Sequence, residues 1–232
     1  MNVALMYSGG KDSTFALEFI KSKGWNLKYL LSVKPTRTDC FLFHYATVEH
    51  TPKIAKMLNF PHHLISCDIA DPKGEANLIK EFVEKNKVEA LILGGTGLQE
   101  TQIRSLQEAM LPLGVEVFAA HAGEDHGEVF KQMLDNGYEI LISQVASDGL
   151  MKWLGKILTK DNFEELAKDS FKYGFHVGFE GGYADTFILN CPLFTQKFVI
   201  EEMEINKEDA YCGHVVIKQL KRVDKIVESF VE

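Results

Sequence analysis

Five short apolar runs, separated by segments with helical spacing, fill the first half of this 232-residue chain and constrain its fold more than any other feature. Each run is short enough to be a buried strand. The segments between them repeat an apolar residue every three or four positions, as at Ile103, Leu106 and Met110, which gives a helix one apolar stripe. Strands and helices that alternate in this way predict a parallel sheet with helices on both faces. The predicted strands are Asn2–Tyr7, Leu27–Val33, His63–Cys67, Ala90–Leu93 and Val115–Phe118.

The pattern of apolar residues changes near residue 122, where glycines begin to interrupt shorter segments with helical spacing. Apolar residues with helical spacing from Leu150 to Ile157 predict one such piece. Phe198–Ile205 and Cys212–Val223 are rich in β-branched residues and predict an antiparallel pair around a turn. We therefore expect a Rossmann-like α/β domain over residues 1–122 and a smaller α+β domain over residues 123–232.

Composition excludes several classes of protein. The chain has 25 Lys and Arg against 33 Asp and Glu, a net charge of -8, whereas proteins that bind nucleic acid strongly present a basic surface. No apolar run approaches the roughly 18 residues that cross a bilayer, and the first residues lack the basic stretch of a signal peptide. The cysteines form no Cys-x-x-Cys pair, which argues against a zinc knuckle. We expect a cytoplasmic protein with no membrane partner and no strong binding to nucleic acid.

The first predicted strand is followed at once by Ser-Gly-Gly-Lys-Asp-Ser, residues 8–13, and then by a helical pattern. Two glycines let the backbone approach an anion closely, and the start of a helix offers unpaired N–H groups and the positive end of its dipole. The hydroxyls of Ser8 and Ser13 can donate to phosphate oxygens, and Lys11 can neutralise developing charge. Asp12 suits such a site when a divalent cation lies between its carboxylate and the phosphates. The segment therefore predicts a phosphate-binding loop at the carboxyl end of a strand.

The spacing of this loop differs from that of the Walker motif, which places four residues between its first glycine and Gly-Lys-Ser/Thr. The loop resembles instead the PP-loop of the N-type ATP pyrophosphatases. The resemblance implies that ATP is cleaved between its α and β phosphates and that the loop holds the leaving pyrophosphate. Such enzymes activate an oxygen of the substrate as an adenylate, and a nucleophile then displaces AMP. Gly94-Gly95-Thr96 closes the fourth predicted strand, either as a second approach to the nucleotide or as an ordinary strand-to-helix turn.

Three further stretches are similar to one branch of this superfamily, the diphthine-ammonia ligases. Phe41–Tyr45 resembles the aromatic-Met-Phe-His segment of that family, and Glu180–Thr186 resembles its Glu-Gly-Gly segment. Pro192–Phe194 is similar to its Pro-Leu-Phe tail, and the resemblance runs in order from residue 2 to about residue 195. It implies the last step of diphthamide synthesis, in which a carboxylate on translation elongation factor 2 is amidated with ATP and ammonia.

The chain departs from the family pattern at Tyr183 and Ala184, and again at Thr101 and Ile103 in the helix after the fourth strand. These departures leave two alternatives open. One is a PP-loop enzyme with another acceptor, such as a small-molecule carboxylate or an RNA base. The other is a noncatalytic regulator that binds a nucleotide. Free ammonia is the simplest nitrogen donor because no region resembles a glutaminase, and the sequence leaves a homo-oligomer open.

The resemblance also implies roles for individual residues. Lys11, Asp12 and His44 are the expected catalytic residues, with Mg²⁺ held by Asp12. An acidic substrate site would suit a trimethylammonium group, because carboxylates and aromatic faces both attract it. The pairs His62–His63 and His121–His126 lack the cysteine or carboxylate pattern of a metal site, and we expect none there. The expected ATP-binding residues are Ser8, Gly9, Gly10, Lys11, Asp12, Ser13, Gly94, Gly95 and Thr96, and the expected substrate-binding residues are His44, Tyr45, Glu100, Gln102, Glu180, Gly181, Gly182, Asp185 and Thr186.

Overall fold

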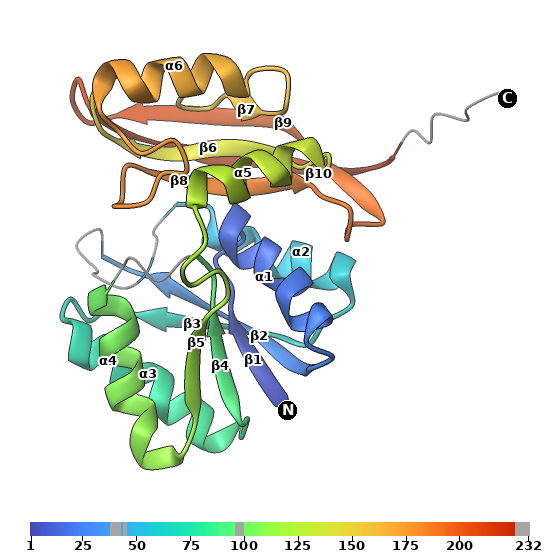
Figure 1. Ribbon diagram of the computed structural model, residues 1–232, viewed down its shortest axis with the longest axis vertical. Coiled ribbons are helices and arrows are strands. Elements are labelled where there is room, and N and C mark those ends of the chain that lie inside the picture. Colours follow the sequence, from blue (N-terminus) through green and yellow to red (C-terminus); the bar gives the residue numbers. More distant parts are fainter. Residues whose placement is uncertain (38–42, 44–45, 96–99, 226–232) are drawn as a thin grey trace, which may run out of the picture.

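A computed structural model describes residues 1–37, 43, 46–95 and 100–225, with the backbone alone at residues 100–102. The expected parallel α/β sheet is confirmed, and it forms one of the two layered halves in Figure 1. Its strands lie in the order β3-β2-β1-β4-β5, and every neighbouring pair is parallel. The order reverses between β1 and β4, which is where sheets of this kind bind ligands at their carboxyl edge. The strands are β1 (Asn2–Met6), β2 (Asn26–Pro35), β3 (His62–Cys67), β4 (Ala90–Leu93) and β5 (Glu116–Ala119).

Helices cover both faces of this sheet, as the alternation of apolar runs predicts (Figure 1). Side chains along β1 alternate between the faces, so Leu5 packs with one pair of helices and Ala4 with the other. Short 3-10 turns precede the second helix and follow the fourth. The helices on the first face are α1 (Lys11–Ser22) and α2 (Thr51–Leu58), those on the second are α3 (Pro72–Lys85) and α4 (Glu100–Met110), and the 3-10 turns are η1 (Val48–His50) and η2 (Leu111–Leu113).

The second half of the chain forms an antiparallel sheet with two helices. Its order is β7-β6-β10-β9, and a further strand, β8, also pairs with β6. The expected antiparallel pair is confirmed, since β9 and β10 align from Gly213 opposite Lys207 to Asp224 opposite Gln196. The elements are α5 (His126–Asp135), β6 (Glu139–Ala146), β7 (Ile157–Leu158), α6 (Phe163–Tyr173), β8 (Ala184–Asn190), β9 (Gln196–Lys207) and β10 (Cys212–Asp224).

The prediction of a helix from Leu150 to Ile157 is wrong. The segment forms consecutive turns, and Ile157 begins β7 by pairing with Leu141 of β6. Its spacing did identify core residues, because Leu150 is completely buried. Gly149 and Gly155 bracket the segment with φ angles of 74° and 78°. This left-handed conformation interrupts a regular helix.

One hydrophobic cluster extends from the first sheet into the second. It includes Leu5 and Ile20 from β1 and α1 together with Ile140 and Phe187 from β6 and β8. The strands of the two sheets fall on either side of residue 122, but the division into domains 1–122 and 123–232 stays a prediction. Within the described part of the chain, no helix is both long enough and apolar enough to span a bilayer.

Acid should destabilise this fold through His62, whose Nε2 lies 2.8 Å from the Ser32 hydroxyl. Burial, aided by the neighbouring His63, lowers the pKa of His62 from 6.5 to about 4. The folded state therefore favours the neutral ring. The contribution of neutral His62 to the unfolding free energy is fully present above pH 6.5 and is lost as the pH falls towards 4. We expect His62→Gln to reduce the loss of unfolding free energy between pH 7 and pH 5 by roughly 1 kcal/mol after solvent screening. Urea unfolding at both pH values measures it, and equal losses in the wild type and the variant would contradict it.

Candidate functional site

The loop between β1 and α1 is shaped to receive an anion. Gly9 adopts a φ of 80°, and Gly10 caps α1 in an extended conformation. The Gly10 amide donates to the Ser8 hydroxyl at 3.3 Å, and that hydroxyl lies 3.1 Å from the hydroxyl of Ser13. Gly10, at the N-cap position, offers no side-chain cap to the N-terminus of α1. The loop therefore places two hydroxyls beside the positive end of a twelve-residue helix.

Strand β8 brings the end of the segment Glu180–Thr186 against this loop. The Ile188 amide donates to the Gly9 carbonyl at 2.9 Å, and the Lys11 amide donates to the Thr186 hydroxyl at 3.1 Å. A side chain at Gly10 would come within 3.0 Å of the Thr186 carbonyl, so only glycine fits there without movement. The two segments line one cleft of about 70 Å³. Its lining comprises Ser8, Gly10, Lys11, Asp12, Ala46, His126, Gly178, Phe179, Glu180, Gly182, Ala184, Asp185 and Thr186.

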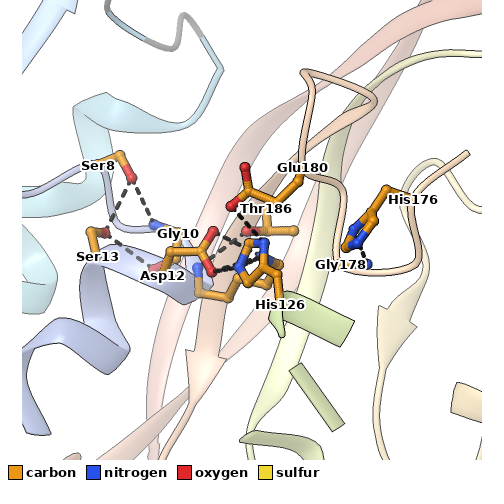
Figure 2. A network of polar contacts seen from close by, with 10 residues as sticks. Ser8, Gly10, Asp12, Ser13, His126, His176, Gly178, Glu180 and Thr186 are labelled. Atoms are coloured by element: carbon orange, nitrogen blue, oxygen red, sulfur yellow. Dashed lines mark hydrogen bonds and ion pairs between the residues drawn. The ribbon is translucent and has the colours of Figure 1, made fainter. Parts of the chain in front are cut away.

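A network of four charged or titratable side chains crosses this cleft (Figure 2). The Lys11 ammonium lies 2.7 and 2.8 Å from the two carboxylate oxygens of Asp12. His126 joins the loop to the Glu-Gly-Gly segment, because its Nε2 lies 2.6 Å from Asp12 Oδ1 and its Nδ1 lies 2.6 Å from Glu180 Oε1. The structure thus brings together Asp12 and Glu180, which the sequence separates widely.

The contacts within this network shift the pKa values of its members. Burial acts to raise the pKa of Asp12, but Lys11 and His126 outweigh it and hold that pKa well below its usual range. The pKa of Glu180 is also lowered, because contact with His126 outweighs burial. Burial and Lys11 act to lower the pKa of His126, yet Asp12 and Glu180 raise it above 6.5. Two carboxylates with lowered pKa values therefore face Lys11 and a histidine whose pKa is raised.

Lys11 is held away from bulk solvent, with 2% of its surface exposed. Its ammonium lies 3.2 Å from His126 Nε2 and 5.3 Å from the centre of the Phe130 ring. It is thus held between Asp12 and the first turn of α5. Its expected role at the bond between the α and β phosphates stays a prediction.

The end of β4 contacts the same site. A side chain at Gly94 would meet the Ser13 amide nitrogen at 2.6 Å, so β4 and the first turn of α1 touch through their backbones. Gly95 has a φ of 82°, and a side chain there would lie 3.5 Å from Glu180 Oε1. Both glycines therefore lie at the loop, where close approach to a nucleotide was expected.

The remaining expected residues divide into two groups. Gly182 and Asp185 line the cleft, and Gly181 adopts a φ of 99° in the turn before them. His44, Tyr45 and Thr96 lie outside the described residues, and so do the side chains of Glu100 and Gln102 at the start of α4. Over the described ranges, no three acidic, histidine or cysteine side chains are grouped as metal ligands. Mg²⁺ at Asp12 stays a prediction.

His126 is the site residue that sequence reasoning missed. The sequence suggests it only as one of a pair with His121, for which no metal site is expected, and in the structure His121 stacks on Phe15 with ring centres 4.7 Å apart. The available signal was its position: His126 begins a helix after β5, on the carboxyl side of the strand. Asp125 caps that helix by accepting a hydrogen bond from the Glu128 amide at 3.0 Å.

Removing the Thr186 hydroxyl should weaken the contact between β8 and the loop. Thr186→Val leaves the Lys11 amide without its acceptor, and the loss of such a cap lowers the unfolding free energy by about 0.5–2 kcal/mol. Thr186→Ser keeps the hydroxyl and should retain most of this stability. Urea unfolding of both variants measures the difference, and equal stability of the valine and serine variants would contradict the assigned contact.

Comparison with known proteins identifies the family of this chain. Residues 1–117 match the family model described as diphthamide synthase N-terminal domain, and residues 125–223 match diphthamide synthase C-terminal domain. The diphthine--ammonia ligase of Homo sapiens is 27% identical over 95% of this chain and 91% of its own length, and that of Danio rerio is 28% identical over 91% and 92%. The ligase of Schizosaccharomyces pombe is 27% identical over 88% of this chain and 37% of its own length.

Likeness to solved structures is weaker. The WlbA dehydrogenase from Thermus thermophilus is 13% identical with a TM-score of 0.31, over 97% of this chain and 72% of that chain. That score is too low to carry any functional inference. The two family models, in contrast, cover almost the whole chain in the expected order. The chain therefore belongs to the diphthamide synthase family, and the relatives named above are ligases.

Proposed function

We propose that this protein is a cytoplasmic ligase that amidates diphthine on translation elongation factor 2, using ATP and ammonia. The reaction proceeds through an acyl adenylate and releases AMP and pyrophosphate. One observation carries the proposal beyond family membership: the loop at residues 8–13 and the segment Glu180–Thr186 line the same cleft. A site for the nucleotide and a site for an acceptor are thereby adjacent, as a transfer between bound reactants requires.

The residues of the loop fit ATP. Gly10 gives the N-terminus of α1 no side-chain cap of its own, and the Ser8 and Ser13 hydroxyls lie beside it. Backbone N–H groups and hydroxyls in this arrangement suit phosphate oxygens. ATP would supply the adenylyl group: the acceptor carboxylate would attack the α phosphate to form an acyl adenylate, with pyrophosphate as the leaving group. The Thr186 hydroxyl accepts a hydrogen bond from the Lys11 amide and so fixes the position of the loop relative to the acceptor side of the cleft.

The acceptor side of the cleft suits a substrate that carries a cation. Glu180 is held ionised by its contact with His126, and Asp185 lies on the same lining. Carboxylates attract the trimethylammonium group of diphthine. Gly182 and Ala184 are small and leave space beside these acids. β8 lies over the loop, and this cover favours the exclusion of water from an acyl adenylate.

Product analysis tests the proposal. The protein is incubated with ATP, ammonia and elongation factor 2 bearing diphthine, and the nucleotides are separated. We expect AMP and pyrophosphate in equal amounts when ammonia and the modified factor are both present, and neither product without the modified factor. Formation of ADP and phosphate would contradict cleavage between the α and β phosphates. Intact ATP after long incubation would favour the noncatalytic regulator instead.

A further inference from the structure

His126 is the first residue of α5 and contacts three functional side chains at once. Its Nε2 lies 2.6 Å from Asp12 Oδ1 and 3.2 Å from the Lys11 ammonium, and its Nδ1 lies 2.6 Å from Glu180 Oε1. We propose that His126 is a positioning residue that holds the carboxylates of Asp12 and Glu180 in one fixed arrangement for adenylation. This inference rests on the proposed function, because it assigns His126 to a step of that reaction.

The contacts at both ring nitrogens support a bridge. The His126 side chain is 2% exposed, so water does not compete freely for it. His126 Nε2 is hydrogen-bonded to Asp12 Oδ1, and Nδ1 lies at ion-pair distance from Glu180 Oε1. The ring therefore sits between the two carboxylates and contacts each through a different nitrogen. These two contacts fix the orientation of Asp12 on α1 and of Glu180 on the loop before β8.

The backbone around His126 is built to keep the ring in place. A side chain at Gly178 would come within 2.9 Å of the His126 carbonyl, so the loop that carries Glu180 touches α5 directly. One helical turn after His126, the Phe130 ring packs 5.7 Å from that of Phe179. Phe179 has a φ of 66°, a conformation that a non-glycine residue adopts only when its surroundings impose it. Helix and loop therefore form one unit that presents His126 and Glu180 together.

Loss of the bridge has a definite consequence for the site. Without His126, two ionised carboxylates would approach the loop with Lys11 as the remaining basic side chain of the network. Like charges repel, and each carboxylate would turn towards solvent or towards Lys11. Binding of ATP through the loop amides and hydroxyls would persist, since His126 contacts neither group. The turnover step, which needs the carboxylates of Asp12 and Glu180 in a fixed relative position, would slow.

A thermodynamic cycle tests the bridge without reference to any reaction. In the wild type, Glu180→Gln should lower the equilibrium constant for folding by about tenfold, because it removes the ionic contact with the His126 ring. In a His126→Ala background, the same change should lower it less than about threefold. Urea unfolding supplies all the constants. Equal effects in both backgrounds would overturn the bridge, whether or not the protein amidates diphthine.

Kinetics test the assignment to the reaction. With ATP, ammonia and elongation factor 2 bearing diphthine, His126→Ala should lower kcat for amide formation by about 10–100-fold, the usual effect of losing a group that orients functional ligands. The KM for ATP should change less than about threefold. Val129→Ala is the matched control, because Val129 is a core residue of the same helix. Even where Val129→Ala lowers the unfolding free energy as much as His126→Ala does, it should leave kcat within about twofold of the wild type. Added imidazole should restore part of the kcat of His126→Ala.

Three outcomes would overturn the assignment to the reaction. One is a wild-type kcat in His126→Ala, the second is an equal loss of kcat in Val129→Ala, and the third is a rise in KM for ATP with kcat unchanged. If the wild type itself fails to amidate the factor, the proposed function fails while the unfolding cycle still decides the bridge. The two failures are therefore distinguishable.

Discussion

Replacing Lys11 with methionine should lower the rate of AMP formation by about 10²–10³-fold, the usual effect of removing one group that stabilises developing charge. Methionine keeps an apolar stem beside the Phe130 ring but removes the ammonium that contacts Asp12 and His126. The rate is measured as AMP released in the presence of ammonia and the modified elongation factor. AMP formation at the wild-type rate would exclude Lys11 from the chemistry.

Stability has to be separated from activity in this variant, because Lys11 is buried against an ionised partner. Leaving Asp12 without its ammonium should lower the unfolding free energy by about 3 kcal/mol. The double variant Lys11→Met with Asp12→Asn removes both charges and should recover most of that loss while it remains inactive. Lys131→Met is the control on an exposed lysine, whose partner Asp135 lies on the surface, and it should leave both properties unchanged.

Adding a single methyl group at Gly94 should disrupt the site through the backbone. A Cβ there would lie 2.6 Å from the Ser13 nitrogen, 2.8 Å from the Asp12 carbonyl carbon and 2.9 Å from the Ser13 Cα, none of which can rotate away. Either α1 must move from β4 or the strand must bend. We expect Gly94→Ala to lower the unfolding free energy by about 3 kcal/mol or more and to lower AMP formation at least tenfold, because the phosphate-binding loop is displaced.

Gly137→Ala is the matched control for this prediction. Gly137 has a φ of 81° and open space around its Cα, so alanine there meets only the strain of a left-handed backbone. That strain lowers the unfolding free energy by about 1–2 kcal/mol, and AMP formation should not change. Urea unfolding and product analysis of both variants provide the comparison. If Gly94→Ala were as stable and as active as the control, the contact between β4 and α1 would not position the loop.

The first half of the fold could be predicted because its signals are local. Each strand of the parallel sheet is a short apolar run, and each helix shows its own apolar stripe. β6 and β8 were missed because their partners lie far away in the chain: β6 pairs with β7, β8 and β10. The segment after Gly149 shows the limit of periodicity, since helical spacing marked buried residues without making a helix.

The candidate site could be predicted in its parts but not in its connections. The loop at residues 8–13 and the segment beginning at Glu180 each carry a recognisable pattern, and both line the cleft. The direction of the Lys11 side chain depends on where α5 approaches, which no local pattern encodes. His126 contacts Asp12 across 114 positions of sequence, so only the folded chain shows that an isolated histidine joins the two motifs.

The most direct measurement of the central claim is the fate of labelled ammonia. Elongation factor 2 bearing diphthine is incubated with the protein, ATP and isotopically labelled ammonia, and the peptide with the modified histidine is analysed by mass spectrometry. We predict that the label appears in that histidine side chain as a carboxamide, only with ATP and in proportion to the AMP released. AMP release with no label in the peptide would show that the cleft activates another acceptor and would contradict the proposed function.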